Sequence, residues 1–451
     1  MEGIHISNPN YTENPTTSLG IELGSTRIKA VRVDRNRAVL ESGSHHWESR
    51  FAEGHWTYSL EDVKTGLRDA VSALSGEADL TDGIGPITTI GISAMMHGYL
   101  VFDKDGNLLV PFRTWKDTTT KESADRLTAL FDFNIPERWS VAHLYQAILN
   151  KEPHVKDIAF ITTLAGYVHW RLTGRKVIGV GDASGMFPIS GGTWNPDFVG
   201  KFRELTGINW LEIAPEILTA GQDAGSLTDE GMQYLFGDNT GIAAGHCTLC
   251  PPEGDAGTGM VSCKAIAPGT GNVSAGTSIF AMIVLEKPSS RLHREIDIVT
   301  TPDGRDVAMV HYNECTSKID PRIELFAEAF EFFGRKIGTR ELYDGLYEYA
   351  LKKDSRLGAF MRETLESAVS DLASGIRVLT EDEHVRVDRL AGHGGFFKSG
   401  LAGRTIMSEL TGIPIELSET AAEGGAWGIA LLADYLNDAG HMTLGEYLEA
   451  K

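Results

Sequence analysis

The sequence predicts an α/β fold made of two halves that share one design. Strand-like and helical patterns alternate along the 451 residues, which is typical of α/β proteins. A hairpin pattern near the start of the chain recurs near residue 272, as expected of a duplicated architecture. Fifty glycines beside sixteen prolines indicate many tight turns and close backbone approaches, and no segment has the low complexity of a flexible linker.

The first hairpin is predicted close to the start of the chain. Leu19–Leu23 is a short, mostly apolar strand, and Ile28–Val33 alternates apolar and polar residues like a second strand. The turn between them is Gly24-Ser25-Thr26, and Asp34–Asn36 turns the chain again. A P-loop would instead lead from a strand through a glycine-rich loop into a helix.

The second hairpin repeats this pattern. Asn272–Ala275 leads into the turn Gly276-Thr277-Ser278, and Ile279–Leu285 is again strand-like. Aligning the first glycines of the two turns, Gly24 and Gly276, pairs three apolar positions: Ile21 with Val273, Ile28 with Phe280, and Val31 with Ile283. This correspondence predicts a duplicated architecture.

Other segments complete the alternation. A stripe of apolar residues predicts a helix, beginning near Met361, with one buried face: Leu365, Val369, Leu372, Ile376 and Leu379. Further helices are predicted at Ser59–Leu74, Lys121–Phe131, Thr163–Leu172 (ended by Gly174), Gly400–Leu410 and Glu423–Leu436. Strands are predicted at Thr88–Ser93, Val387–Ala391 and Ile413–Leu417, and a hairpin at Leu100–Phe112 that turns at Asp105-Gly106-Asn107.

The chain is predicted to divide near residue 260. Residues 1–18 are polar and contain no apolar stretch, so we expect a flexible leader and no secretory signal. Residues 19–260 are then the first domain and residues 261–451 the second, and each contains one of the two hairpins.

Charge and hydropathy exclude several classes of partner. The chain has 41 Lys and Arg against 62 Asp and Glu, a formal net charge of −21. Such a surface repels phosphate backbones and anionic lipid, which argues against nucleic acid and membrane partners. No run approaches the ~18 apolar residues that a membrane span requires. A small molecule is the expected partner.

The four cysteines are too few to staple a chain of this length. They fit a reducing compartment, so a cytoplasmic location is expected. Cys247 and Cys250 have the spacing of half a zinc site, but no second pair of Cys or His follows closely, and buried free thiols are the simpler interpretation.

Both hairpin turns carry groups that suit phosphate. Their glycines let the backbone approach a ligand, and their hydroxyl and N–H groups can grip phosphate oxygens. Either turn alone is more often a simple hairpin connection. A matched pair at equivalent places in two halves favours a phosphate-binding function.

Two carboxylates lie next to these turns. Asp255 lies among small residues in Gly254-Asp255-Ala256-Gly257, where it is open to a ligand; a helix N-cap is the structural alternative. Glu22 lies inside an apolar strand and needs a partner there. A Mg²⁺ ion bridged to nucleotide phosphates would supply one, and a strand position that faces solvent is the alternative.

The glycine cluster Gly392-His393-Gly394-Gly395 lies between a predicted strand and a predicted helix. Bare backbone of this kind suits a nucleotide base or ribose. The cluster is not a G-x-G-x-x-G sequence that follows the first strand, which argues against NAD.

Two segments in the first half carry candidate sugar-binding groups. Met96-His97-Gly98 follows a predicted buried strand, although a lone His is more often a core residue than a ligand-binding one. Trp115-Lys116-Asp117 offers an aromatic face beside hydrogen-bonding groups, which suits a polyol.

Taken in this order, these segments resemble the FGGY carbohydrate kinases over most of the chain, from about Leu19 to Leu436. The resemblance implies two duplicated actin-like (ribonuclease H-like) domains with a cleft between them. It implies an ATP-dependent kinase of a small ketose, of the xylulokinase or ribulokinase type, that uses Mg²⁺. Homodimerisation is implied by the resemblance alone.

The resemblance also implies residue roles. Asp255, in a Gly-Asp-x-x-Gly-like segment, is expected to be the catalytic base and, with Glu22, a metal ligand. Sugar contacts are expected from Met96, His97, Trp115 and Asp117. ATP contacts are expected from the two turns, a nearby lysine and the glycine cluster: Gly24, Ser25, Thr26, Lys29, Gly276, Thr277, Gly392, Gly394 and Gly395.

The chain departs from the family pattern in two places. Glu22 stands where the family usually has Asp, and Leu351–Phe360 is short where members usually carry a longer segment. These departures motivate an alternative, a catalytically impaired nucleotide-binding regulator of the same fold. A kinase of another polyol or a sugar acid is a further alternative. An Hsp70-like or actin-like ATPase fits less well, because no peptide-binding domain is recognised after the nucleotide core.

Overall fold

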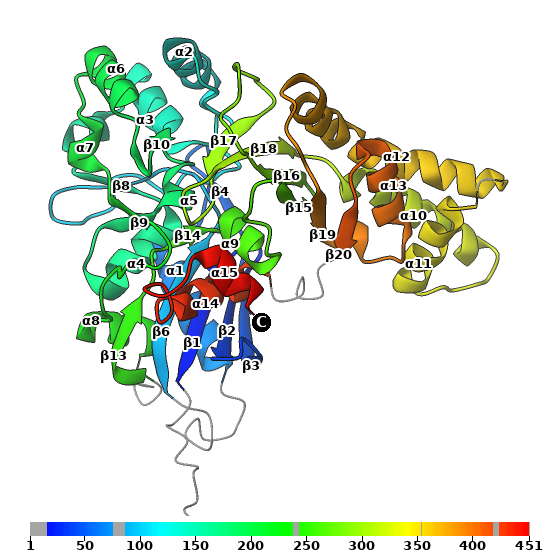
Figure 1. Cartoon of the computed structure of the whole chain (residues 1–451), viewed down its shortest axis with the longest axis horizontal. Coiled ribbons are helices and arrows are strands. Elements are labelled where there is room, and N and C mark those ends of the chain that lie inside the picture. The colour runs from blue at the N-terminus through cyan, green and yellow to red at the C-terminus, as the bar shows by residue number, and fades with distance from the viewer. Residues whose placement is uncertain (1–15, 75–85, 238–242, 353, 418–423, 451) are drawn as a thin grey trace, which may run out of the picture.

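Two mixed β-sheets organise the chain, one in each half (Figure 1). This computed structural model describes residues 16–74, 86–237, 243–352, 354–417 and 424–450. The first sheet has the strand order β13 (Ala243–Leu249), β6 (Ile87–Ala94), β1 (Thr17–Leu23), β2 (Arg27–Asp34) and β3 (Val39–His46), with β14 (Glu253–Gly254) also beside β6. β1, β2 and β3 pair antiparallel, whereas β6 runs parallel to β1 and β13 parallel to β6.

The second sheet repeats these pairings. Its order is β17 (Asp297–Thr300), β18 (Asp306–Tyr312), β16 (Ile279–Val284), β15 (Thr270–Ala275), β19 (Arg389–His393) and β20 (Ile415–Leu417). β15, β16 and β18 pair antiparallel, and β19 and β20 run parallel to β15. The expected duplication is therefore confirmed, with β15, β16, β18, β19 and β20 in the places of β1, β2, β3, β6 and β13.

The predicted alignment of the two hairpins is right for their first strands and wrong by one residue for their second strands. Leu23 pairs with Ile28 across residues 24–27, whereas Ala275 pairs with Ile279 across residues 276–278. Because the first turn is one residue longer, the equivalent of Ile28 is Ile279 and not Phe280.

Glycines in the first sheet allow helices to approach closely on both faces. Helix α1 (Leu60–Ser72) covers one face and helix α14 (Gly424–Tyr435) crosses the other. A Cβ atom at Gly20 would lie 2.1 Å from the carbonyl oxygen of Ala426, and one at Gly43 would lie 2.2 Å from that of Ala70. Residues with side chains at these two positions would push the helices away from the sheet.

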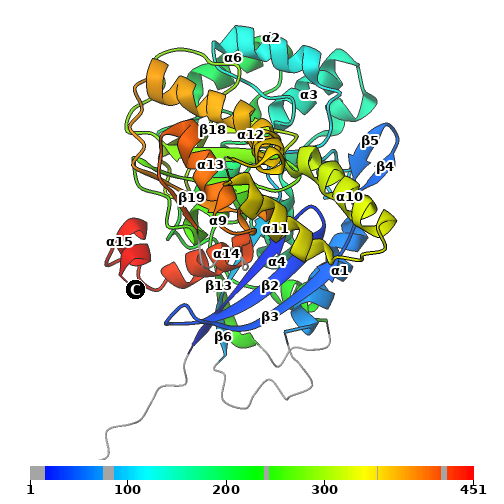
Figure 2. The ribbon, with the colours of Figure 1, turned by 90° about the vertical axis from the view of Figure 1, so that its right-hand side faces the viewer.

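Four helices cover the outer face of the second sheet (Figures 1 and 2). They are α10 (Thr316–Phe332), α11 (Thr339–Ala350), α12 (Arg356–Arg377) and α13 (Ala402–Thr411). The opposite face packs toward the first half, where one hydrophobic cluster includes Met282 of β16, Met260 of α9 (Asp255–Ser262) and Ile429 of α14. The halves thus share a core.

The chain between β6 and β13 forms a mainly helical region along the left side of Figure 1. Its helices are α2 (Lys121–Phe131), α3 (Ser140–Leu149), α4 (Leu164–Thr173), α5 (Val180–Ala183), α6 (Pro196–Thr206), α7 (Trp210–Ile213) and α8 (Asp229–Phe236). Its short strands are β7 (Leu100–Phe102), β8 (Phe160–Thr162), β9 (Val177–Gly179), β10 (Ile189–Ser190), β11 (Thr193–Trp194) and β12 (Glu216–Leu218). A further pair, β4 (Arg50–Ala52) and β5 (His55–Thr57), precedes α1.

Most of the predicted helices are confirmed, with caps at their ends. Ser59 caps α1 by accepting the N–H of Asp62 at 3.0 Å, and Thr163 caps α4, which ends at Gly174 with φ +73°. The five side chains of the predicted stripe are fully buried: four lie on α12, and Leu379 lies in the π-helical turn (Val378–Asp382) that follows it.

Three predictions are corrected. Helix α12 begins at Arg356, five residues before Met361, and strand β19 continues to His393, so it includes the first two residues of the glycine cluster. In the predicted hairpin at Leu100–Phe112 the turn is correct, with Gly106 at φ +83°, but its return arm makes single bridges, and β7 pairs with β8 instead. Pro111 lies in that arm and lacks the N–H that a longer ladder requires.

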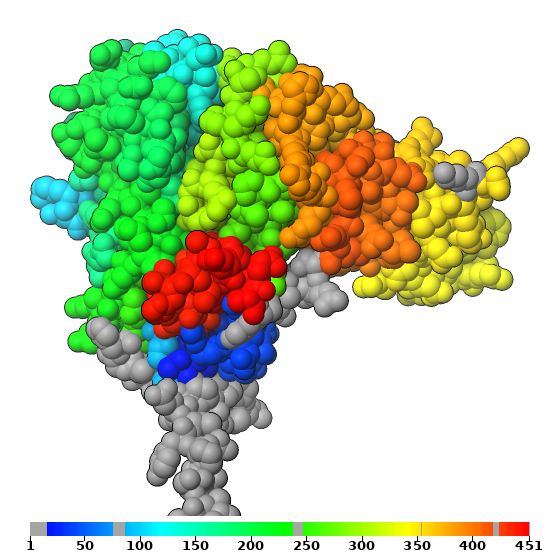
Figure 3. Space-filling model, viewed as in Figure 1, coloured from blue at the N-terminus to red at the C-terminus, as the bar shows by residue number. Residues whose placement is uncertain are grey.

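The division near residue 260 falls inside α9 and stays a prediction. After α13 the chain returns to the first half: α14 packs on β1, β2 and β6, and in Figure 3 the red C-terminal part of the chain, which includes α15 (Leu444–Glu449), lies against the blue N-terminal part. Strand β1 begins at Thr17, inside the predicted leader; residues 1–15 and Glu423 lie outside the described residues. No helix in the described ranges combines the length and the apolar character needed to cross a membrane.

Candidate active site

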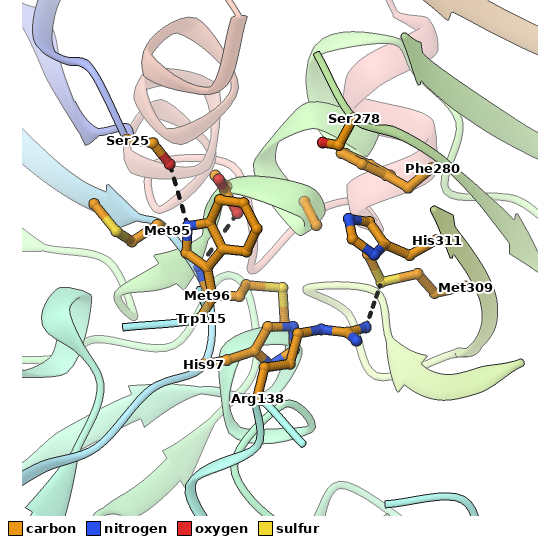
Figure 4. A pocket seen from close by; sticks show the side chains of 12 residues that line it. Ser25, Met95, Met96, His97, Trp115, Arg138, Ser278, Phe280, Met309 and His311 are labelled. Atoms are coloured by element: carbon orange, nitrogen blue, oxygen red, sulfur yellow. Dashed lines mark hydrogen bonds between the residues drawn. The ribbon is translucent and has the colours of Figure 1, made fainter. Parts of the chain in front are cut away.

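A cavity of about 160 Å³ gathers side chains from both halves (Figure 4). Five of the predicted site residues line it: Ser25, Met96, His97, Trp115 and Asp255. Ser278, from the second hairpin turn, lines it as well. Cavities for drug-sized ligands span about 300–1,000 Å³, so this cavity suits a smaller molecule.

Asp255 is the first residue of α9, directly after β14. Its N-cap is Gly254, so the predicted N-cap role of Asp255 is wrong by one residue. The carboxylate Oδ1 accepts the N–H of Met96 at 3.3 Å. Burial raises the pKa of Asp255 to about 6, although the N–H groups of Met96 and Ala256 act in the opposite direction. At neutral pH this group is therefore an ionised carboxylate with more than usual basicity.

Glu22 points toward the start of α14. Its Oε2 accepts the N–H of Ala426 at 3.2 Å, and it lies opposite Lys29 in the β1–β2 ladder. Burial and repulsion by Asp255 raise its pKa to about 7, against the lowering effect of Ala426 and Lys29. The alternative of a solvent-facing carboxylate is therefore wrong.

The Glu22 and Asp255 carboxyls fit a Mg²⁺ ion. Two half-buried carboxyls that repel one another are relieved by a cation between them. Mg²⁺ in phosphate sites commonly takes one or two carboxylates and completes its shell with phosphate oxygens and water. The described residues contain no group of three or more His, Cys, Asp or Glu side chains that could hold a metal ion, so these side chains alone would not complete such a shell.

His97 is held in a strained backbone conformation. Its φ is +69°, and Gly98 follows at φ +89°. Its Nδ1 donates to the carbonyl of Gly185 at 3.1 Å, and burial, reinforced by Arg138, keeps its pKa well below the usual range. The ring is thus neutral, and Nε2 is left as an acceptor without a partner among the described residues. Strain of this kind is typical of functional sites.

Aromatic side chains hold the first turn. Trp115 Nε1 donates to Ser25 Oγ at 3.2 Å, Tyr58 donates to the carbonyl of Ser25 at 2.6 Å, and Trp47 donates to the carbonyl of Gly24 at 2.7 Å. The bonds from Tyr58 and Trp47 hold the two backbone carbonyls of the turn in place. Trp115 therefore links the phosphate and sugar elements that the sequence predicts separately.

The second turn is held by the start of α10. The N–H groups of Cys315 and Thr316 donate to the carbonyls of Thr277 and Gly276, at 2.8 and 3.0 Å. A Cβ atom at Gly276 would meet nothing closer than 3.9 Å, so open space lies beside this glycine. This space fits the predicted approach of a phosphate.

The glycine cluster packs around the second turn. Gly394 has φ +98°, and a Cβ atom there would lie 2.3 Å from the carbonyl oxygen of Ala275. A Cβ atom at Gly395 would meet only Thr316, at 3.8 Å. The cluster and the second turn thus form one glycine-lined wall.

Not every predicted residue reaches the cavity. The carboxylate of Asp117 bonds to His55 and accepts the N–H and hydroxyl of Thr119, at 2.8 and 2.6 Å. It lies outside the lining, so its contact with sugar stays a prediction. The other predicted nucleotide and metal contacts do not line the cavity, and they also stay predictions: Gly24, Thr26, Lys29, Glu22, Gly276, Thr277, Gly392, Gly394 and Gly395.

One wall of the cavity was not predicted from the sequence; it is formed by Arg138, Phe280, Met309 and His311. His311 interrupts the apolar run of β18, which is a signal that could have been noticed. Burial and the nearby Arg138 lower the pKa of His311 to about 4, so its ring is neutral. Arg138 lies in a loop without a recognisable pattern.

The pairing of two buried carboxyls, Glu253 and Asp182, was not predicted from the sequence. Glu253 accepts the N–H groups of Gly181 and Asp182 at 3.2 and 2.9 Å, and Asp182 accepts the hydroxyl of Thr163 at 2.6 Å. Burial and mutual repulsion raise the pKa of Glu253 to about 8, and burial with repulsion by Asp255 raises that of Asp182 to about 7.

This pair predicts a loss of stability as the pH rises. The folded protein keeps the Glu253 proton up to a pH of about 8, whereas the unfolded chain loses it near 4.5, so the free energy of unfolding falls across this window. Asp182→Asn, which cannot ionise, should make the fall shallower, and Asp105→Asn, an exposed control, should not. Urea unfolding at a series of pH values measures this. Equal slopes in Asp182→Asn and wild type would contradict it.

The four cysteines are buried and none is in a disulfide, as the simpler interpretation expected. Burial raises the pKa of Cys247 to about 11 and that of Cys315 to about 12, so these thiols stay protonated. No thiol lines the cavity.

Sequence profiles of one family match both halves. The N-terminal domain of the FGGY family of carbohydrate kinases matches residues 17–247, and its C-terminal domain matches residues 326–436. A xylulose kinase of Staphylococcus xylosus is 23% identical over 236 residues, which are 48% of this chain and 46% of the relative. An L-fuculokinase of Escherichia coli (strain K12) is 29% identical over 262 residues, 51% of this chain and 50% of the relative. The chain thus spans about half the length of these curated relatives.

Solved structures share the fold over nearly the whole chain. A ligand-bound xylulose kinase from Lactobacillus acidophilus superposes with a TM-score of 0.79, covering 96% of this chain and 91% of its own, at 15% identity. Identity this low shows the fold alone. The shared fold confirms the two actin-like domains that the resemblance to the FGGY kinases implied.

Proposed function

This chain belongs to the FGGY family of carbohydrate kinases, and from that membership we propose that it phosphorylates a small ketose with ATP. The proposed acceptor is a pentulose of the xylulose or ribulose type. One observation carries the proposal: a single small cavity joins Asp255 to both hairpin turns and to the sugar-binding candidates His97 and Trp115. The xylulose kinase relatives add support for a pentulose.

Asp255 is the proposed general base. The proton of the attacking hydroxyl moves to its carboxylate as the acceptor oxygen bonds to phosphorus and the bond to the leaving ADP breaks. A pKa of about 6 suits this role, because the group is ionised at neutral pH and still takes up a proton readily. The N–H of Met96 holds the carboxylate in place.

The other residues position and shield the reactants. ATP supplies the phosphoryl group, and Mg²⁺ would neutralise the charge that builds up on its oxygens. Glu22 and Asp255 would hold the ion, and the two turns and the glycine wall would hold the nucleotide against the repulsion of a chain with net charge −21. Closure of the two halves would keep water from the transferred group.

Release of ADP in a coupled assay tests the proposal. The panel comprises pentuloses, hexuloses, polyols and aldonic acids, so it includes the alternative acceptors. We expect one ketose to stimulate ADP release strongly in the presence of Mg²⁺. Nucleotide binding without stimulation by any acceptor would overturn the proposal.

One observation favours the second candidate, a regulator with impaired catalysis. Helix α11 ends at Ala350 and α12 begins at Arg356, so the connection is short where the family usually carries more chain. A regulator would bind nucleotide with the same affinity whether or not sugar is present, and it would form no sugar phosphate.

A further inference from the structure

Arg138 lies where the cavity meets the contact between the two halves. It lies in the loop between α2 and α3, and Met309 and His311, which line the cavity beside it, come from β18 in the second half. Figure 4 shows its guanidinium reaching toward these two residues, on the side of the cavity away from Ser25 and Ser278.

An ion pair across the halves orients this side chain. Nη2 of Arg138 pairs with Asp297 of β17 and lies 3.9 Å from the Met309 sulfur. Asp297 also accepts the side-chain N–H of Asn134 at 2.8 Å. The Arg138 and Asp297 side chains are only 16% and 9% exposed. A guanidinium held in this way presents its remaining donors in a fixed direction.

The orientation leaves donors for a ligand. Nε and Nη1 of Arg138 have no hydrogen-bond partner among the described residues, whereas the charge is already balanced by Asp297. The neutral His97 and His311 add no charge to this wall. Spare N–H groups on a neutralised cation suit an uncharged hydroxyl or carbonyl oxygen better than a carboxylate.

We infer that Arg138, oriented by Asp297 of the other half, binds an uncharged oxygen at the end of the acceptor remote from Asp255 and thereby selects the acceptor. The inference rests on the proposed function, and it names a specificity-determining residue of the same cavity. It also means that both halves must be in contact for the remote end of the sugar to be recognised.

Steady-state kinetics of Arg138→Lys test this inference. Lysine keeps a charge for Asp297 but loses the planar set of donors, so KM for the ketose should rise by about 10- to 100-fold, with kcat and KM for ATP nearly unchanged. The matched control is Arg294→Lys. Arg294 pairs with Asp125 at 2.7 Å across the same contact between the halves, but it does not line the cavity, so KM should stay at the wild-type value.

A deoxy analogue of the ketose that lacks its remote hydroxyl gives a second readout. Wild type should bind the analogue more weakly than the parent sugar. Arg138→Lys should distinguish the two sugars little, because the substitution and the deoxy change each remove one side of the same hydrogen bond. A purely structural role of Arg138 would not produce this coupling.

The outcomes separate the two proposals. If wild type phosphorylates a ketose and Arg138→Lys keeps the wild-type KM, the inference is wrong and the proposed function stands. An equal rise of KM in Arg294→Lys would assign the effect to the contact between the halves and also overturn the inference. If wild type phosphorylates no acceptor, the proposed function fails and the inference fails with it.

Discussion

Replacing Asp255 with asparagine is expected to lower kcat by about 10²–10⁴. Asparagine cannot take up the proton of the acceptor hydroxyl, although its side-chain oxygen can still accept the N–H of Met96. The fold should tolerate the change, because burial disfavours the charge that the substitution removes. Affinity for ADP measured without Mg²⁺ should stay near that of wild type.

Asp182→Asn serves as the matched control for this substitution. Asp182 is a buried carboxyl close enough to Asp255 to sense its charge, but it does not line the cavity, so most of kcat should remain. Rates are compared by the coupled assay and affinities by calorimetry. Normal turnover in Asp255→Asn would rule out its role as base.

The same carboxylate sets the acid limb of the rate profile. Below a pH of about 6, Asp255 becomes protonated, so kcat/KM should fall about tenfold for each pH unit. The residual activity of Asp255→Asn should lack this limb.

Replacing Gly394 with alanine is expected to weaken nucleotide binding by about 5- to 150-fold, the equivalent of about 1–3 kcal/mol of strain. Gly394 has φ +98°, which L residues rarely adopt, and the new Cβ atom would lie 2.3 Å from the carbonyl oxygen of Ala275. Since Ala275 leads directly into the second turn, the clash would shift the wall that is proposed to hold the phosphates.

Gly412→Ala is the control for this effect. Gly412 also has a positive φ, +71°, but a Cβ atom there would meet nothing within 4 Å, and the residue ends α13 away from the cavity. It should cost stability without changing the affinity for ADP. Titration calorimetry measures the affinity of each variant for ADP. Wild-type affinity in Gly394→Ala would contradict the proposal that the glycine-lined wall holds the nucleotide.

Local signals account for the elements that the sequence predicted well. The side chains of Ser59 and Thr163 accept backbone N–H groups at helix starts, and Gly174 ends α4 in the left-handed conformation. The stripe on α12 follows from the helical period alone. Such features depend on a few neighbouring residues, so they can be predicted from the sequence without knowledge of the tertiary structure.

Elements that depend on distant partners were missed. Strand β3 is largely exposed and does not alternate cleanly; it is a strand because it pairs along β2. Helix α10 buries only Ile319 and Ile323 among its apolar residues, which leaves no clear stripe. The returning α14 was predicted as a helix, but its contact with Gly20 is visible only in three dimensions.

The site residues also fall into two groups, those that local sequence predicts and those that depend on distant partners. Asp255 and His97 belong to short motifs, and the structure brings both to one cavity. Arg138 and His311 come from different halves and are brought together by the contact between the halves, which includes the Arg138–Asp297 ion pair and which no local pattern encodes. Asp117 belongs to a motif, but its carboxylate is engaged by His55, a partner far away in the sequence.

The most direct test of the central claim is the stoichiometry of products. ADP and phosphorylated sugar should be quantified together, by the coupled assay and by ³¹P NMR, after incubation with ATP, Mg²⁺ and the ketose that stimulates most. A sugar kinase with Asp255 as base predicts one sugar phosphate for each ADP in wild type and almost none in Asp255→Asn. ADP formed without sugar phosphate, or equal yields in the two proteins, would contradict the account.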